Sequence, residues 1–362
     1  MVQHWTSRLA VLTWRLAWPI TTPASTTATF MTSSSQRLSP VSESRQDAPT
    51  LSALRERALS VEAHLQGIVR GQASTIRMLW ACVLAQGHAL LEDLPGTGKT
   101  TLAKAMAQSV SAEFNRVQFT PDLMPSDITG TTVFNPKDQA FIFHPGPIFC
   151  NVLLADEINR ASPRTQSALL EAMEERQVSS EGKTLSLPHP FFVIATENPI
   201  DMHGTYPLPE AQLDRFFCKL SLGYVSEDDE VKILISKLAG QSSQQSSFAP
   251  LSVQDLRELQ DACSRIHVSE PMARYVAQIA RHTRENPEVA MGASARGSLA
   301  LMRMSQACAF LQGRDHALPE DAQLCAIPAL AHRIAVKASG LHSNIRGSDV
   351  VKTALSHVKA PS

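Results

Sequence analysis

The fold of this chain is decided by the stretch Leu90-Leu91-Glu92-Asp93-Leu94-Pro95-Gly96-Thr97-Gly98-Lys99-Thr100-Thr101. The apolar run from Ala89 to Leu91 predicts a short buried strand, and residues 102–107 continue after the glycines at helical spacing. A strand, a glycine-rich loop and a helix in this order predict a P-loop. Glycines let backbone N–H groups close around phosphate oxygens, and the helix N-terminus adds a partial positive charge. The stretch therefore predicts that the chain binds ATP.

Two side chains of this loop carry the expected chemistry. Lys99 is expected to reach the β- and γ-phosphates, and the Thr100 hydroxyl is expected to ligate Mg²⁺, which makes ATP and Mg²⁺ the predicted cofactors. The general pattern has a glycine where this chain has Asp93. A chance Gly-Lys-Thr in a surface turn is the alternative, and the strand and helix on either side argue against it. The residues expected to contact the nucleotide here are Pro95, Gly96, Thr97, Gly98, Lys99, Thr100 and Thr101.

Length and composition limit the possible classes of protein. With 362 residues, 43% hydrophobic and 6% aromatic, the chain can form two domains with their own cores. The net charge of −1 gives no global basic surface for nucleic acid or anionic membrane. The six cysteines are scattered without a Cys-x-x-Cys pair, which favours reduced thiols in a cytoplasmic protein and no structural metal.

The N-terminal segment differs from the rest. Residues 1–42 contain no Asp or Glu but three arginines, a composition that can mark a targeting segment. The apolar stretch from Leu9 to Trp18 is interrupted by Arg15 and is too short to span a bilayer. The alternatives are a disordered tail or a start codon assigned too early, with translation from Met31. We favour these two for residues 1–50 and expect no transmembrane segment in the chain.

The remaining sequence predicts an α/β core followed by a helical lid. Strands and helices alternate after the P-loop, which predicts a parallel sheet sandwiched by helices, with β-hairpin inserts at residues 120–147 and 176–190. We assign residues 51–240 to this core and the Gly/Ser/Gln-rich residues 241–250 to a linker. Residues 251–362 show no strand pattern and predict an all-helical lid domain.

Two further strands end in polar residues that suit ATP hydrolysis. The run Asn151-Val152-Leu153-Leu154-Ala155-Asp156-Glu157 places two carboxylates at the carboxyl end of a buried strand. We expect Asp156 to hold Mg²⁺ together with Thr100, and Glu157 to act as the general base. Asn198 ends the next strand and could orient the attacking water, although Asn198-Pro199 alone also fits a simple turn.

The chain resembles the MoxR family of AAA+ ATPases, and the resemblance extends from about Ile68 to about Ile334. The family implies an AAA+ core and a lid, ATP hydrolysis and assembly into a ring. The most specific resemblance lies in Gly204-Thr205-Tyr206-Pro207-Leu208-Pro209-Glu210-Ala211-Gln212-Leu213-Asp214-Arg215-Phe216. Other runs that carry it are Gln118-Phe119-Thr120-Pro121-Asp122-Leu123, Pro145-Gly146-Pro147-Ile148-Phe149, Ala155-Asp156-Glu157-Ile158-Asn159-Arg160-Ala161 and Leu169-Leu170-Glu171-Ala172-Met173-Glu174-Glu175.

The resemblance assigns roles to residues outside the P-loop. Asn198 matches the sensor-1 residue, and Arg215 matches the arginine finger, which acts on the nucleotide of the neighbouring subunit. A surface ion pair between Asp214 and Arg215 is the alternative. Arg296 matches the sensor-2 arginine at the start of a lid helix, with Ala295 in place of the usual proline. These three residues join Glu157 as the expected catalytic set.

The resemblance also implies an adenine site and a role for the hairpins. Val69, Gly71 and Gln72 match the residues that pack around adenine, and an ordinary helix-to-loop turn is the alternative. The segment 120–147 matches the hairpin that the family inserts in its second helix, and 176–190 matches the hairpin before sensor 1. Such hairpins face a central pore or a partner, and a structural edge hairpin is the alternative.

The leading functional hypothesis is a chaperone-like remodelling ATPase that acts as a ring homo-oligomer, with a hexamer expected. The resemblance implies a von Willebrand factor A domain protein as a partner and a role in the maturation or assembly of other proteins. A magnesium-chelatase-type ATPase subunit is the close alternative. A nucleic-acid-dependent AAA+ translocase is a third, which the near-neutral charge disfavours. A nucleotide-gated scaffold that binds ATP without turnover is a fourth.

Overall fold

The protein is described by a computed structural model. The described residues are 50–92, 96–180, 182–198, 205–238, 248–337 and 345–361, and they belong to the compact unit Ala48–Ser362. The expectations for residues 1–49, for Pro95 and for most of the linker fall outside these ranges. The domain limits proposed from the sequence stay predictions.

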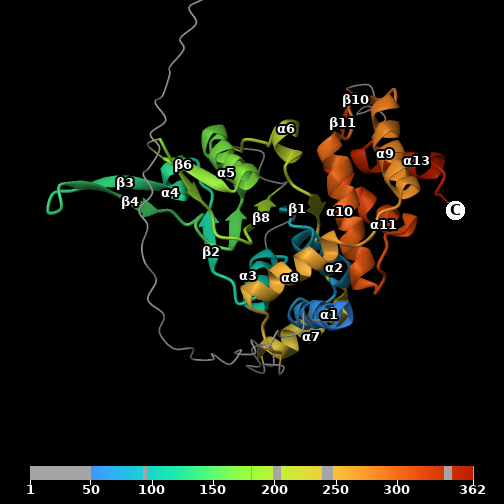
Figure 1. Ribbon diagram of the computed structural model, residues 1–362, viewed down its shortest axis with the longest axis horizontal. Coiled ribbons are helices and arrows are strands. Elements are labelled where there is room, and N and C mark those ends of the chain that lie inside the picture. Colours follow the sequence, from blue (N-terminus) through green and yellow to red (C-terminus); the bar gives the residue numbers. More distant parts are fainter. Residues whose placement is uncertain are drawn as a thin grey trace, which may run out of the picture. The chain divides into compact units, whose positions relative to one another are not determined.

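A five-stranded sheet of parallel strands forms the centre of the core (Figure 1). Its strand order is β2-β5-β8-β1-β9. The bounds are β1 Ala89–Glu92, β2 Phe114–Gln118, β5 Val152–Asp156, β8 Phe192–Glu197 and β9 Cys218–Leu220. Parallel pairing throughout confirms the predicted fold class. Strand β9 is not predicted from the sequence, because a three-residue strand is too short for an alternating pattern.

Alternating side chains divide the apolar residues of this sheet between two clusters. Leu91 and Leu154 point into the cluster that contains helices of the N-terminal part and of the lid. Leu90 and Leu153 point into the other, which contains one face of α5. All four are buried completely, as a sheet covered on both faces requires.

Side-chain caps and a proline mark where two of the core helices begin. The Thr50 side chain caps the first of them by accepting a 3.3 Å hydrogen bond from the Ala53 N–H. Ser162 caps the helix after β5, and Pro163 occupies its first turn. The bounds are α1 Leu51–Ile68, α2 Ala73–Leu84, α3 Lys99–Ser109, α4 Pro125–Thr129, η1 Ile158–Arg160, α5 Pro163–Glu175, α6 Glu210–Leu213 and α7 Glu227–Leu238.

Both predicted hairpins are present. Strands β3 (Gly130–Asn135) and β4 (Ala140–Pro145) form an antiparallel ribbon that projects from the core in Figure 1. Strands β6 (Gln177–Ser180) and β7 (Lys183–Ser186) form the second ribbon. The first ribbon follows the short helix α4, and together these elements fill the segment 120–147.

The C-terminal part is helical but not entirely so. Its helices are α8 Val253–Ser264, α9 Glu270–Glu285, α10 Ala295–Leu311, α11 Pro319–Leu330, η2 Ala331–Arg333 and α13 Gly347–His357. The expectation that no strand follows residue 251 is wrong, because β10 (Val289–Met291) and β11 (Ala335–Val336) pair in an antiparallel ribbon. None of the described helices combines the length and the apolar character needed to cross a membrane.

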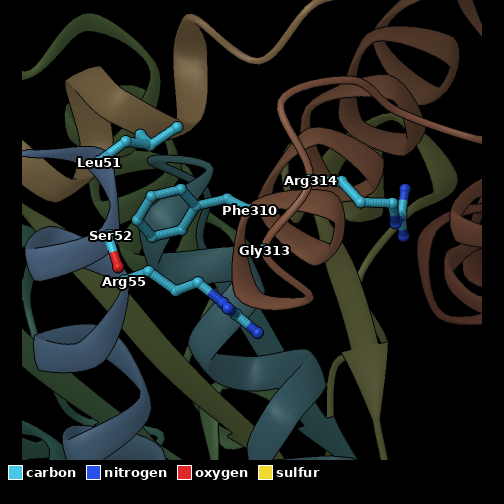
Figure 2. A pocket seen from close by; sticks show the side chains of 6 residues that line it. All are labelled: Leu51, Ser52, Arg55, Phe310, Gly313 and Arg314. Carbon is cyan, nitrogen blue, oxygen red and sulfur yellow. The ribbon is translucent and has the colours of Figure 1, made fainter.

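The start of α1 packs against the end of α10, and a small cavity of about 140 Å³ lies between them (Figure 2). Arg55 reaches across it and donates from Nε to the Leu311 carbonyl at 3.2 Å. Gly313 makes this approach possible, since a Cβ there would lie 2.4 Å from Arg55 Nη1. The hydrogen bond between Arg55 and Leu311 therefore joins the core to the lid.

Candidate nucleotide site

The predicted phosphate loop has the backbone that phosphate binding needs. Gly96 and Gly98 adopt φ angles of 86° and 95°, in the left-handed region that favours glycine. Apart from the chain neighbours of each glycine, no atom of the described residues lies within 4 Å of the position that a Cβ would take at either one. Gly98 is the N-cap of α3 and makes no side-chain cap bond. The first N–H groups of α3 are therefore oriented as in an anion site.

The loop side chains follow directly on this backbone. Lys99 is the first residue of α3 and is 9% exposed, and Thr100 comes next in the first turn. Thr97 and Thr100 are half-buried and Thr101 is exposed. Pro95 lies outside the described residues. This half of the predicted site lies at the carboxyl end of β1.

Asp156 ends strand β5, which β8 separates from β1, and its side chain is nearly buried. Its Oδ1 accepts a 2.6 Å hydrogen bond from the Thr196 hydroxyl. Its Oδ2 accepts from Arg116 Nη2 at 2.7 Å, so a guanidinium group neutralises the carboxylate. The carboxylate and the Thr100 hydroxyl are hard oxygen donors of the kind that Mg²⁺ prefers. The donor set fits Mg²⁺ once Arg116 moves aside.

Glu157 leaves the sheet in a left-handed conformation, with φ of 56°. Its N–H donates to the Thr196 hydroxyl at 2.8 Å. Its Oε2 accepts from Gln118 Nε2 at 3.0 Å and from Arg160 Nη1 at 2.9 Å. The expected general base is thus held by an amide donor from β2 and a guanidinium donor from η1.

Asn198 lies at the carboxyl end of β8, beside β5 and β1. It is buried, and its carbonyl accepts a 3.2 Å hydrogen bond from Asn159 Nδ2. The preceding Glu197 has its pKa raised by burial, which the nearby Lys219 ammonium partly opposes. Parallel pairing therefore brings Asn198, Asp156, Glu157 and the phosphate loop to one edge of the sheet.

The expected adenine residues form a tight loop between α1 and α2. Val69 and Gln72 are buried. Gly71 has φ of 74°, and a Cβ on it would lie 2.9 Å from Asp229 Oδ2 at the start of α7. The loop is therefore held by helix packing, as expected both of an adenine site and of an ordinary turn.

Arg215 and Arg296 lie elsewhere. Arg215 precedes β9, so it lies at the amino edge of the parallel sheet, opposite to the phosphate loop. Glu174, near the end of α5, pairs with Arg215 at 3.1 Å and also with Arg296 of α10. Asp214 pairs with Arg333 at 3.1 Å and accepts from the Ser294 hydroxyl at 2.9 Å. No ion pair between Asp214 and Arg215 occurs in the described structure.

Four residues that hold the predicted site residues in place are not predicted from the sequence. Three of them contact the acids at the carboxyl edge of the sheet, and the fourth, Glu174, contacts the arginines at the amino edge. Thr196 joins the two acids, and Arg116 and Gln118 reach them from β2. A sequence signal exists for Arg116 and Gln118, because they are two residues apart on a strand, β2, and therefore point to the same face beside Asp156. Glu174 belongs to a run that resembles the family, and nothing in the sequence pairs it with both arginines.

Comparison with known proteins decides the family. The profile of the ATPase family associated with various cellular activities (AAA) matches residues 88–218, and that of the AAA lid domain matches residues 281–353. Chaperone MoxR1 of Mycobacterium tuberculosis is 38% identical over 303 residues, which cover 81% of this chain and 80% of the relative. The chain belongs to the MoxR family of AAA+ ATPases.

Other relatives agree with this MoxR-family assignment. The protein YeaC of Bacillus subtilis is 44% identical over 299 residues, covering 82% of this chain and 93% of YeaC. The solved structure of a candidate ATPase from Cytophaga hutchinsonii superposes with a TM-score of 0.79 at 34% identity, covering 86% of this chain and 97% of that one. The predicted AAA+ core with a helical lid is confirmed.

Proposed function

We propose that this MoxR-family protein hydrolyses ATP at a site that is completed by a second copy of the chain. One observation carries the proposal: the two halves of the predicted site lie at opposite edges of the same sheet. The phosphate loop, Asp156 and Glu157 lie at the carboxyl edge, whereas Arg215 and Arg296 lie at the amino edge. These arginines cannot be assigned to the nucleotide of their own chain.

Each residue of the carboxyl edge has a proposed task. Lys99 and the N–H groups of the loop bind the phosphates. Thr100 and Asp156 would hold Mg²⁺, which neutralises charge on the phosphate oxygens when bound. Glu157 accepts the proton of the attacking water, and Asn198 orients that water. Val69, Gly71 and Gln72 would contact adenine.

Before this chemistry, the contacts of the acids must change. Arg116 neutralises Asp156, and Gln118 and Arg160 bind the carboxylate of Glu157. An Asp156 carboxylate paired with a guanidinium is a poor metal ligand, and the Glu157 Oε2 that already accepts two hydrogen bonds is not free to contact the attacking water. Binding of Mg²⁺ and ATP is therefore expected to release these side chains.

The arginines of the amino edge would act on the neighbour. Arg215 would neutralise charge that develops on the γ-phosphoryl group during transfer, and Arg296 would assist it from α10. A contact between two different faces of identical chains is heterologous and closes into a ring if the rotation allows. We propose such a ring, with a hexamer as the expected size.

The biological role is proposed from the family. A relative is named Chaperone MoxR1, which supports a chaperone-like remodelling role in the maturation or assembly of other proteins. A partner with a von Willebrand factor A domain and a cytoplasmic location complete the proposal. The projecting β3–β4 hairpin offers a surface through which nucleotide-driven motion could act on a client.

The test of hydrolysis is Glu157→Gln, which keeps the size of the side chain but removes the base. Turnover is expected to fall by about 10²–10⁴-fold, while ATP binding is retained. The exposed Glu171→Gln on α5 is the matched control and should turn over like wild type. Equal turnover in Glu157→Gln and wild type would overturn the enzyme proposal. The same variant, held in the ATP state, is the natural bait for capturing clients.

A further inference from the structure

A cavity of about 230 Å³ lies at the amino edge of the sheet, between α5, the residues before β9 and the lid. Its charged lining is unbalanced, because five arginines face two carboxylates. The arginines are Arg176, Arg215, Arg296, Arg303 and Arg333, and the carboxylates are Glu174 and Asp214.

Both carboxylates already have partners. Glu174 pairs with Arg215 and Arg296, and Asp214 pairs with Arg333. Among the described residues, neither Arg176 nor Arg303 makes a side-chain hydrogen bond or an ion pair. Two guanidinium groups therefore stay uncompensated at the edge where Arg215 is proposed to meet the neighbour's nucleotide.

The placement of these two arginines follows from their helices. Arg296, Leu299 and Arg303 are spaced i, i+3 and i+7 on α10, which puts all three on one exposed face. Arg176 is the C-cap of α5, with φ of 53°. Glycine is the usual residue for this left-handed cap. From this cap the Arg176 side chain reaches the lining of the cavity.

Electrostatics supports the same conclusion. Burial lowers the pKa of Arg176, and the neighbouring Arg303 lowers it further. His88, which also lines the cavity, is neutral, since burial lowers its pKa to about 4. Arginine nevertheless keeps its charge at neutral pH. The two guanidinium groups repel each other, and an incoming anion would relieve that repulsion.

We propose that Arg176 and Arg303, together with Arg215 and Arg296, bind the polyphosphate chain of the nucleotide held by the neighbouring copy. This inference rests on the proposed function. Several guanidinium groups in one cavity match an anion with several oxygens, because each group can donate two parallel hydrogen bonds to phosphate. The alternative is that Arg176 only stabilises the end of α5 and that Arg303 is simply solvated.

The first measurement is steady-state ATP turnover at protein concentrations where assembly is complete. Arg303→Gln and Arg176→Gln are each expected to lower turnover by about tenfold, as loss of a charge-assisted contact in the transition state would. Arg303→Lys should recover part of the loss. The exposed Arg274→Gln on α9 is the matched control. Thermal melting confirms that each variant is folded.

The second measurement is a mixing experiment that separates action on the neighbour from action on the same chain. Arg303→Gln subunits keep an intact phosphate loop, and Glu157→Gln subunits keep intact arginines. In random head-to-tail rings about a quarter of the interfaces combine the two intact halves. Turnover of the equal mixture should reach about a quarter of the wild-type rate, above the mean of the two parents.

Two results would overturn the inference. One is turnover of both Arg176→Gln and Arg303→Gln within twofold of wild type while Arg215→Ala is strongly impaired. The other is impaired turnover of Arg303→Gln without any gain on mixing. If Arg215→Ala also turns over like wild type, it is the proposed function itself that fails, so the two failures are distinguishable.

Discussion

Thr196 connects the two acids of the candidate site through one hydroxyl group. The hydroxyl donates to Asp156 at 2.6 Å and accepts from the Glu157 N–H at 2.8 Å, and the side chain is fully buried. Valine has the same shape without the hydroxyl, so Thr196→Val leaves a buried N–H group and a carboxylate oxygen unpaired. We expect the free energy of unfolding to fall by about 1–3 kcal/mol and turnover to fall at least about tenfold.

Chemical denaturation and ATP turnover measure these two effects. Thr196→Ser is the control, since it keeps the hydroxyl and should restore both values. Wild-type turnover in Thr196→Val would show that the orientation of the two acids does not depend on Thr196.

A second single residue couples stability to pH. Burial lowers the pKa of His88 to about 4, and the ring accepts from the Val193 N–H at 2.9 Å. The unfolded chain, with the ordinary value near 6.5, binds more protons between these two pH values. The contribution of neutral His88 to the free energy of unfolding is therefore complete above pH 6.5 and is lost as the pH falls toward 4. The half-buried His332, whose pKa is lowered to about 3 chiefly by desolvation, acts in the same direction.

For His88 alone the expected loss between pH 7 and pH 5 is about 2 kcal/mol of unfolding free energy. Urea unfolding of wild type and His88→Gln at the two pH values measures it. The variant should be less stable at pH 7 but should lose less on acidification. Equal losses in the two proteins would contradict the assignment.

Site residues can be predicted from the sequence where they lie within a recognisable motif, such as a buried strand that ends in polar residues. Asp156 and Glu157 could be placed because a buried strand delivers whatever follows it to the carboxyl edge. Thr196 could not, since its contacts depend on how β8 is aligned with β5. That register comes from packing across strands far apart in the sequence.

Among the elements, the β3–β4 hairpin is unusual because both of its faces expose apolar side chains. Phe134 lies opposite Phe141 with ring centroids 5.3 Å apart, and Val133 lies opposite Ile142. Phe141 is 70% exposed. A two-stranded ribbon gains little stability alone, and a projecting apolar one is a surface for a partner.

This exposure predicts that the aromatic pair matters little for folding. Changing both Phe134 and Phe141 to Thr should lower the free energy of unfolding by less than about 1.5 kcal/mol and reduce the binding of a hydrophobic dye. Phe119→Ala, at a fully buried position, is the contrast and should cost about 3–5 kcal/mol. A comparable loss for the hairpin variant would mean that the hairpin packs on the rest of the chain.

The elements also show where prediction from sequence ends. The helix at Pro163–Glu175 was predictable because its cap, its proline and its apolar spacing agree. The β10–β11 pair was not, because two strands of three and two residues carry no period and are joined across a whole helix hairpin.

For the whole molecule, the proposed function makes activity depend on assembly, because the proposed site residues lie at two edges of the sheet. Lys99 and Glu157 lie at one edge, and Arg215 lies at the other on the same rigid sheet. Bending the chain cannot bring them together, because the strands between them are buried and hydrogen-bonded along their length. Under the proposed function, another copy of the chain would supply the arginine.

Turnover per chain should therefore rise with protein concentration and level off when assembly is complete. An arginine finger contributes about 10³–10⁵-fold to turnover, so the dissociated chain should be nearly inactive. Turnover measured across the assembly transition, with oligomer size followed by mass photometry in the same samples, gives the comparison. Arg215→Ala serves as the control, because its low turnover should not rise with concentration even though it assembles. A turnover per chain that stays constant down to the monomer would contradict the shared site, since it would require every catalytic group to reach the nucleotide within one chain.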